Sequence, residues 1–185
     1  GLDAIEAAMA AHPWPEGRPL IIHAQMTRKD QIDRMAELGV TPSFFSAHTY
    51  YWGDRHAAIF MGPERAANMS PARWALDAGV RFSSHLDTPV TPMLPLQAVW
   101  SQVERKSTGG VVIGRAQRIG RMPALRAVTI DAAWQVFMDD EIGSIEPGKR
   151  ADLVVLSENP LTAEDIRGIK VDRTVIDGAT VYARL

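Results

Sequence analysis

The sequence contains no cysteine. This absence excludes disulfide bonds and thiolate metal sites, so a metal ion would have to be bound by histidine and carboxylate side chains. Long apolar runs are also absent: none approaches the roughly 18 apolar residues of a membrane span, and no signal peptide opens the chain. A strong charge of either sign is missing too, because the formal net charge is -2. We therefore expect a cytoplasmic protein that binds neither nucleic acid nor membranes.

The composition that remains is typical of a globular protein. The 185 residues are 46% hydrophobic and 23% charged, which is enough for a substantial buried core. The first residues, from Leu2 to about residue 11, have the apolar spacing of a helix but no clear start signal. We therefore expect the chain to be part of a longer protein.

Residues 19 to 106 alternate between short apolar strands and amphipathic helices. Strands are predicted at residues 20–25, 40–47 and 80–84. The first of them, LIIHAQ, has the unbroken apolar character of a strand buried on both faces. The helix that follows it is predicted to begin with Thr27 as its N-cap and to end at Gly39. Serial strand-helix units of this kind indicate an α/β protein with a parallel sheet.

The pattern changes after about residue 107. A helix is predicted over residues 122–137, and a buried strand over residues 151–156. The end of the chain alternates in polarity around Asp177-Gly178, a dipeptide suited to a two-residue hairpin turn. These elements indicate a few antiparallel strands, separate from the first sheet.

Polar side chains follow the ends of the three predicted parallel strands. His23 lies near the end of the first strand, His48 follows the second, and His85 and Asp87 follow the third. Ligand sites of parallel strand-helix proteins lie at these carboxyl ends, so we expect the four side chains to converge. Imidazole and carboxylate are ligands of zinc-like metals, and a carboxylate beside a metal can accept a proton from water. The alternative is that the histidines are structural and that Asp87 is a turn residue.

The segment from His48 to His56 reads HTYYWGDRH and is predicted to be a long loop. Its aromatic residues Tyr51 and Trp52 suit the wall of a substrate site. They suit equally well an aromatic lid that packs onto its own domain. Both interpretations remain open from these residues alone.

Several motifs resemble those of the metal-dependent amidohydrolases, in particular the subgroup called amidohydrolase 3 or YtcJ-like. The motif GSIEPGKRADLVVL, followed by TVIDGATVY, resembles the C-terminal signature of the superfamily. The segments IIHAQ, GVTPSFFSAHTYYWGDRH and GVRFSSHLDTPVTP resemble the strand motifs of the subgroup. This resemblance implies that residues 1–137 are the last three strand-helix units of a TIM-like (β/α) barrel. Residues 138–185 would then be the C-terminal strands of a small β-sandwich.

The resemblance also implies a site and a reaction. His23 and Asp87 match metal ligands, and Asp87 also matches the general acid/base. His48 and His85 match positions that contact substrate, and we assign Tyr51 and Trp52 to the same wall. The expected cofactor is a divalent metal, zinc in the simplest case, with one or two ions. The expected reaction is hydrolysis of a C–N bond in a small amide, formamide or carbamate by metal-activated water.

Some motifs of the family are missing from these 185 residues. The first His-x-His, the bridging ligand and the strand-five histidine are not present. We therefore expect the chain alone to be inactive or weakly active, with open sheet edges that self-association could cover. A different class of function also remains open, namely a non-catalytic scaffold or interaction module. A third alternative is a metal-independent barrel enzyme in which His23 and His48 are acid and base.

Overall fold

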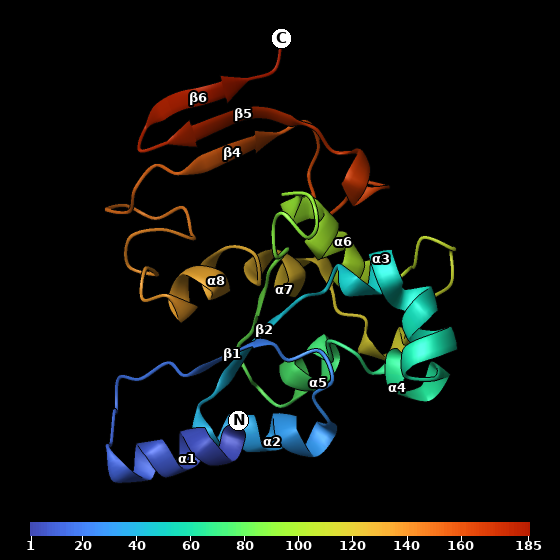
Figure 1. The fold of residues 1–185 in the computed structure, drawn as a ribbon. Helices are drawn as coiled ribbons and strands as arrows, with labels where there is room; N and C mark the ends of the chain where they lie inside the picture. Colours follow the sequence, from blue (N-terminus) through green and yellow to red (C-terminus); the bar gives the residue numbers. More distant parts are fainter.

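The computed structural model describes all 185 residues and contains two separate three-stranded sheets (Figure 1). The first sheet is parallel, and its order β1-β2-β3 follows the chain. Its strands are β1 (Leu20–His23), β2 (Thr41–Phe44) and β3 (Ser83–Ser84). The second sheet is antiparallel and consists of β4 (Leu153–Leu156), β5 (Val171–Ile176) and β6 (Ala179–Ala183). The two sheets confirm the α/β class and the change of pattern after the first sheet.

Helices surround the first sheet and connect it to the second. They are, in chain order, α1 (Leu2–Ala11), α2 (Lys29–Leu38), α3 (His48–Arg55), the π-helix η1 (His56–Phe60), α4 (Pro63–Ala67), α5 (Ala72–Asp77), α6 (Pro95–Glu104), the 3-10 helix η2 (Arg115–Gln117), α7 (Arg121–Arg126), α8 (Ile130–Gln135) and the 3-10 helix η3 (Ile166–Gly168). In Figure 1, α1 and α2 lie at the opposite end of the molecule from the antiparallel sheet. None of these helices is long and apolar enough to cross a membrane.

The main hydrophobic core lies between the first sheet and its helices. Ile32 and Met35 of α2 pack in one cluster with Phe44 of β2 and Val99 of α6, and all four side chains are almost fully buried. Removing that much apolar surface from water is the main stabilising contribution to such a domain. The same core holds the strand ends in place, because Phe44 is the last residue of β2.

The second sheet is attached by the segment that carries the GSIEPGKRADLVVL motif. Asp152 accepts a hydrogen bond from the backbone N–H of Asp177 at 2.7 Å, which connects the start of β4 to the predicted hairpin turn. Lys149 donates to the Ser144 hydroxyl at 2.7 Å and to a backbone carbonyl. Gly143 has a φ of 92°, and a Cβ there would lie 2.8 Å from that of Ala133. These residues of the motif therefore hold the segment together.

Several predicted elements differ from the structure. The segment HTYYWGDRH is not a loop: residues 48–55 form α3 and His56 begins η1, and the aromatic rings of α3 pack against one another and against Phe45 and Trp100. The helix expected over residues 122–137 is interrupted between α7 and α8, where the Thr129 hydroxyl donates to the Leu125 carbonyl at 2.8 Å. The N-cap of α2 is Arg28 and not Thr27, whose hydroxyl instead donates to the Ala24 carbonyl.

The strands also differ from expectation in length and burial. β3 has only two residues, because the Ser84 N–H donates to the Ala127 carbonyl rather than to another strand. β1 is not buried on both faces, since Ile22 is 62% exposed, and the strand also forms one edge of the sheet. β4 is likewise half-open to solvent. Both strands have the apolar composition of covered strands, and their open faces are available to further parts of a larger protein.

An arginine side chain is buried at the end of α6. Arg105 is 1% exposed, and no carboxylate pairs with it. Its guanidinium donates to the carbonyls of Met69 at 2.8 Å, Ile113 at 2.7 Å and Ser70 at 3.3 Å. Burial lowers the pKa of Arg105 to about 10, with a smaller contribution from Arg118, so the group remains charged at neutral pH. The backbone carbonyls therefore provide all the local compensation for this buried charge.

Candidate functional site

The parallel register brings the predicted site residues to one edge of the first sheet. His23 is the last residue of β1 and lies beside Phe44 of β2, which in turn lies beside Ser84 of β3. His85 is the next residue after β3, and its N–H donates to the Phe44 carbonyl at 3.0 Å. Parallel pairing thus places the residues that follow the three strands next to one another, as expected.

His23 and Asp87 approach each other most closely among the charged candidates. Nε2 of His23 lies 3.8 Å from Oδ2 of Asp87, and the two side chains are 46% and 43% exposed. Both residues have positive φ, 66° for His23 and 53° for Asp87. Non-glycine residues in this left-handed region are strained, and such strain is typical of functional sites. The pair is open to solvent and can reach a ligand.

His85 is held by a short series of hydroxyl groups. Nδ1 of His85 lies 2.9 Å from Oγ of Ser43, which lies 2.8 Å from Oγ of Ser83. Its Nε2 is buried and has no hydrogen-bond partner. Burial lowers the pKa of His85, and the nearby His23 lowers it further. His85 is therefore a neutral ring beside the His23–Asp87 pair, with its ring centroid 5.0 Å from that of His23.

His48 lies in an aromatic enclosure at the start of α3. Its ring centroid is 4.4 Å from that of Phe45 and 4.6 Å from that of Trp52. Burial lowers the pKa of His48 to about 4, and the neighbouring rings of His56 and His23 add to this shift. The ring is therefore neutral at pH 7 and can be either a hydrogen-bond donor or an acceptor.

The lowered pKa of His48 predicts a loss of stability in acid. The unfolded chain binds a proton at His48 below about pH 6.5, whereas the folded chain does so only below about pH 4. The free energy of unfolding therefore falls as the pH decreases through this window, by about 1–2 kcal/mol after allowance for the partial exposure of the ring.

Urea unfolding at pH 7 and pH 4.5 measures this effect. His48→Gln is expected to show the smaller difference between the two pH values, whereas His12→Gln, at an exposed site, is expected to match the unsubstituted protein. An equal difference in the His48→Gln variant would contradict the prediction.

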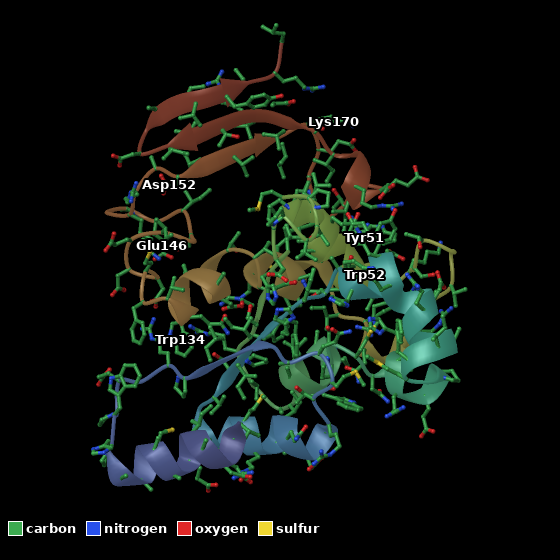
Figure 2. The ribbon with its side chains drawn as sticks, viewed as in Figure 1. Tyr51, Trp52, Trp134, Glu146, Asp152 and Lys170 are labelled. Atoms are coloured by element: carbon green, nitrogen blue, oxygen red, sulfur yellow. The ribbon has the colours of Figure 1, made fainter.

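Tyr51 and Trp52 both project from α3 (Figure 2). Trp52 contacts the rings of His48 and Phe45, so it forms part of the wall near the site. Tyr51 packs with Tyr50 and the small core cluster around Phe45, and burial raises its pKa. The structure thus places Trp52 closer to the histidines than Tyr51.

Two further polar residues lie near the site: Gln25, which was assigned no role from the sequence, and His56, which was predicted only as part of the polar-aromatic segment HTYYWGDRH. Nε2 of His56 lies 3.1 Å from Nδ1 of His48 and 3.3 Å from Nε2 of Gln25. His56 begins the π-helix η1, a form of helix that occurs often at functional sites. Its position within HTYYWGDRH was visible, but its approach to His48 depends on α3, which was predicted to be a loop.

The donor atoms fit a divalent metal in kind but not in number. Imidazole and carboxylate are suitable ligands, and His23 with Asp87 provides one of each. A structural or catalytic zinc site needs about three or four protein ligands. No group of three or more histidine, aspartate or glutamate side chains in the structure could hold a metal ion. His23 and Asp87 alone are therefore too few to form a complete metal site.

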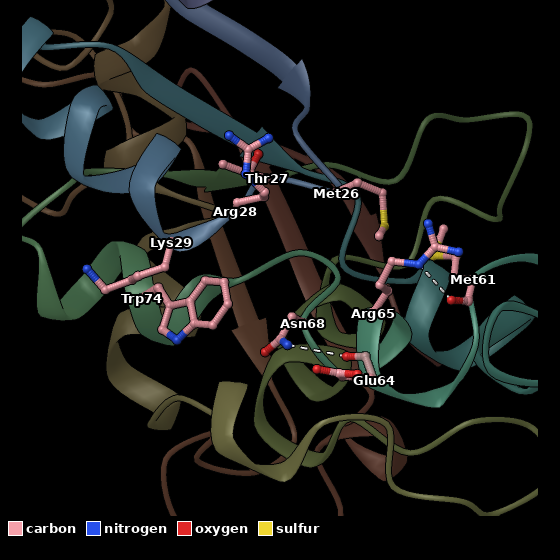
Figure 3. Close-up of a pocket in the computed structure, with 9 residues that line it drawn as sticks. All are labelled: Met26, Thr27, Arg28, Lys29, Met61, Glu64, Arg65, Asn68 and Trp74. Atoms are coloured by element: carbon pink, nitrogen blue, oxygen red, sulfur yellow. Dashed lines mark hydrogen bonds between the residues drawn. The ribbon is translucent and has the colours of Figure 1, made fainter.

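Several pockets lie near the carboxyl ends of the strands, and two of them are candidate substrate sites. One of about 290 Å³ contains His85 and Asp87, together with Met93 and Val128. A larger pocket of about 550 Å³ lies between α2, α4 and α5 and includes Trp74 and Arg65 (Figure 3). The larger pocket contains none of the predicted site residues, and its Arg28 and Lys29 are paired with Asp30 and Asp33. The smaller pocket is therefore the better candidate for substrate.

The similarity of this chain to known proteins agrees with the resemblance seen in its motifs. Residues 1–182 match the sequence model of the Amidohydrolase family. The chain is 32% identical over 164 residues to the N-substituted formamide deformylase of Arthrobacter pascens. The aligned region covers 88% of this chain and 30% of that protein. It is 26% identical over 187 residues to YtcJ of Bacillus subtilis, a protein named as an amidohydrolase. That aligned region covers 96% of this chain and 34% of that protein.

A solved structure shows the same fold. The amidohydrolase of Thermotoga maritima superimposes with a TM-score of 0.69 at 24% identity, over 99% of this chain and 40% of that chain. The chain thus spans about a third of the length of the curated relatives it matches.

Proposed function

Because the chain belongs to the amidohydrolase family, we propose that it carries part of the active site of a hydrolase that cleaves a C–N bond in a small molecule. The candidate bonds are those of an amide, formamide or carbamate. The observation that carries the proposal is the His23–Asp87 pair, 3.8 Å apart at the carboxyl ends of β1 and β3. The name of the Arthrobacter pascens relative, a formamide deformylase, supports this class of bond.

In this proposal Asp87 is the general acid/base. Its carboxylate is exposed and Asp87 lines the smaller pocket, so it can accept a proton from the attacking water. The same carboxyl group then donates the proton to the nitrogen of the leaving group. His48, His85, Trp52 and Tyr51 form or support the substrate wall beside it.

His23 and Asp87 are the residues that would hold a divalent metal ion, with zinc as the first candidate. A metal ion bound there would lower the pKa of water toward neutrality and so make a nucleophile available. The remaining ligands would come from parts of the protein outside these 185 residues. The chain by itself is then expected to be inactive and to bind metal poorly.

The proposed architecture assigns the chain to two domains. Residues 1–137 belong to the C-terminal part of a (β/α)8 barrel, and residues 138–185 belong to a β-sandwich. The parallel order of the first sheet and the separate antiparallel sheet support this division. The open edges of the first sheet would be covered by further barrel strands or, in the isolated chain, by self-association.

Metal analysis combined with hydrolysis assays tests the proposed function. The full-length protein is expected to bind a divalent metal and to hydrolyse at least one member of an amide, formamide and carbamate panel. His23→Ala is expected to lower metal occupancy, whereas His12→Ala, at an exposed site away from the pair, is not. A metal-loaded protein that hydrolyses no C–N bond in the panel would contradict the proposal.

A further inference from the structure

A series of hydrogen-bonding side chains extends behind His48, away from the aromatic rings that enclose it. We infer that Gln25 and His56 fix the tautomer of His48, so that His48 presents Nε2 as a hydrogen-bond acceptor to the substrate. The two residues are positioning residues, since they act through His48. This inference rests on the proposed function and names a feature of the substrate, a hydrogen on nitrogen or oxygen.

The series begins with the orientation of the Gln25 amide. Its Nε2 lies 3.5 Å from Sδ of Met69, whose side chain is fully buried. A thioether sulfur has no hydrogen to donate and is a weak acceptor, so the amide nitrogen is the appropriate group to face it. The reverse orientation would place the amide oxygen against the sulfur lone pairs. Met69 therefore fixes which end of the amide Gln25 directs toward His56.

The amide orientation determines the tautomer of His56. Nε2 of Gln25 has only hydrogens to offer and lies 3.3 Å from Nε2 of His56. Nε2 of His56 must therefore be the acceptor, which places the ring proton of His56 on Nδ1. That Nδ1 is buried without a partner, and it would lack one in the other tautomer too, so it does not decide between them.

The tautomer of His56 then determines that of His48. Nδ1 of His48 lies 3.1 Å from the same Nε2 of His56, whose single lone pair is then shared between the hydrogens of Gln25 and His48. Nδ1 of His48 must therefore carry the hydrogen, and Nε2 on the other side of the ring carries the lone pair. Phe45 and Trp52 lie 4.4 Å and 4.6 Å from the ring of His48, which hinders its rotation.

The lone pair of His48 limits what the site can bind. The rings of His23 and His48 both pack against Phe45, at centroid distances of 5.7 Å and 4.4 Å, so His48 lies at the same end of the sheet as the His23–Asp87 pair. An acceptor at this place favours a substrate that offers an N–H or O–H hydrogen. It disfavours a carbonyl oxygen or an N,N-disubstituted nitrogen, which leaves the imidazole nitrogen unpaired.

Nitrogen-15 NMR of the histidine rings in the full-length protein reads the tautomer directly. The expected pattern for His48 is a protonated Nδ1 and an unprotonated Nε2 at pH 7, with His48→Gln used to assign the resonances. A protonated Nε2 on His48 would overturn the inference. This measurement does not depend on catalysis, so it remains valid even if the proposed hydrolysis is not found.

Gln25→Glu is the decisive variant, because a carboxylate can only accept. Nε2 of His56 would then carry the hydrogen and donate it to residue 25. Nδ1 of His48 faces the same hydrogen and would therefore become an unprotonated acceptor. We expect the NMR pattern of His48 to invert, whereas His12→Gln leaves it unchanged. An unchanged pattern in Gln25→Glu would overturn the inference.

Substrate discrimination gives a second readout that general destabilisation would not produce. The unsubstituted protein is expected to prefer an N-monosubstituted amide over its N,N-disubstituted analogue. In Gln25→Glu this ratio of kcat/KM values should fall by about 10-fold or more, the effect expected for one lost hydrogen bond. His56→Gln keeps an acceptor oxygen and should retain the ratio. A ratio that Gln25→Glu leaves unchanged would overturn the inference about substrate.

Discussion

Replacing Asp87 with asparagine is expected to lower kcat/KM of the full-length protein by about 10²–10⁴-fold, the usual contribution of a general acid/base. Asparagine has nearly the same shape, but its amide cannot accept and return a proton. Because the loss affects a group that acts in the transition state, kcat and kcat/KM should fall together. Steady-state kinetics on the best substrate of the panel measures both.

The control for this variant is Asp140→Asn, which removes an exposed carboxylate far along the chain from the pair. It is expected to leave kcat/KM unchanged. Asp87 is 43% exposed in its side chain, so Asp87→Asn should change the free energy of unfolding by less than about 0.5 kcal/mol. A folded Asp87→Asn protein with undiminished kcat/KM would exclude the acid/base role.

The second large effect is expected at Arg105. Replacing this residue with methionine should destabilise the protein by about 3–5 kcal/mol, because several buried carbonyls lose their only side-chain donor. Lysine should be intermediate, since one ammonium group cannot reproduce the planar set of donors. Urea unfolding of the purified protein at pH 7 measures these changes.

Arg115 provides the matched control, because it is exposed and forms no ion pair in the structure. Arg115→Met is expected to change stability by less than about 0.5 kcal/mol. The effect at Arg105 should also persist at high salt, since its partners are carbonyls within the protein and not a solvent-exposed carboxylate. Equal stabilities of the two methionine variants would contradict this account.

The sequence could predict the parallel sheet and the meeting of His23 with Asp87, because both follow from strand ends that repeat along the chain. It could also predict the hairpin at Asp177-Gly178, because the turn depends on those two residues alone. These features are determined by local pattern or by the general geometry of parallel strands.

Other features depend on contacts between distant parts of the chain. α3 forms although its histidine, tyrosine and tryptophan residues are only moderate helix formers, because their rings pack against Phe45 and Trp100. The burial of Arg105 is set by carbonyls as far away as Met69, and nothing in the local sequence distinguishes it from Arg118. The approach of Gln25 to His56 likewise joins two segments separated by 31 residues.

The order of the first sheet has a consequence for synthesis of the protein. Each parallel strand pairs with the strand that precedes it in the chain, so β2 finds β1 already made and β3 finds β2. The sheet can therefore grow in the direction of translation, with one strand added as each segment leaves the ribosome. In this order the His23–Asp87 pair forms only when β3 docks and brings Asp87 to His23.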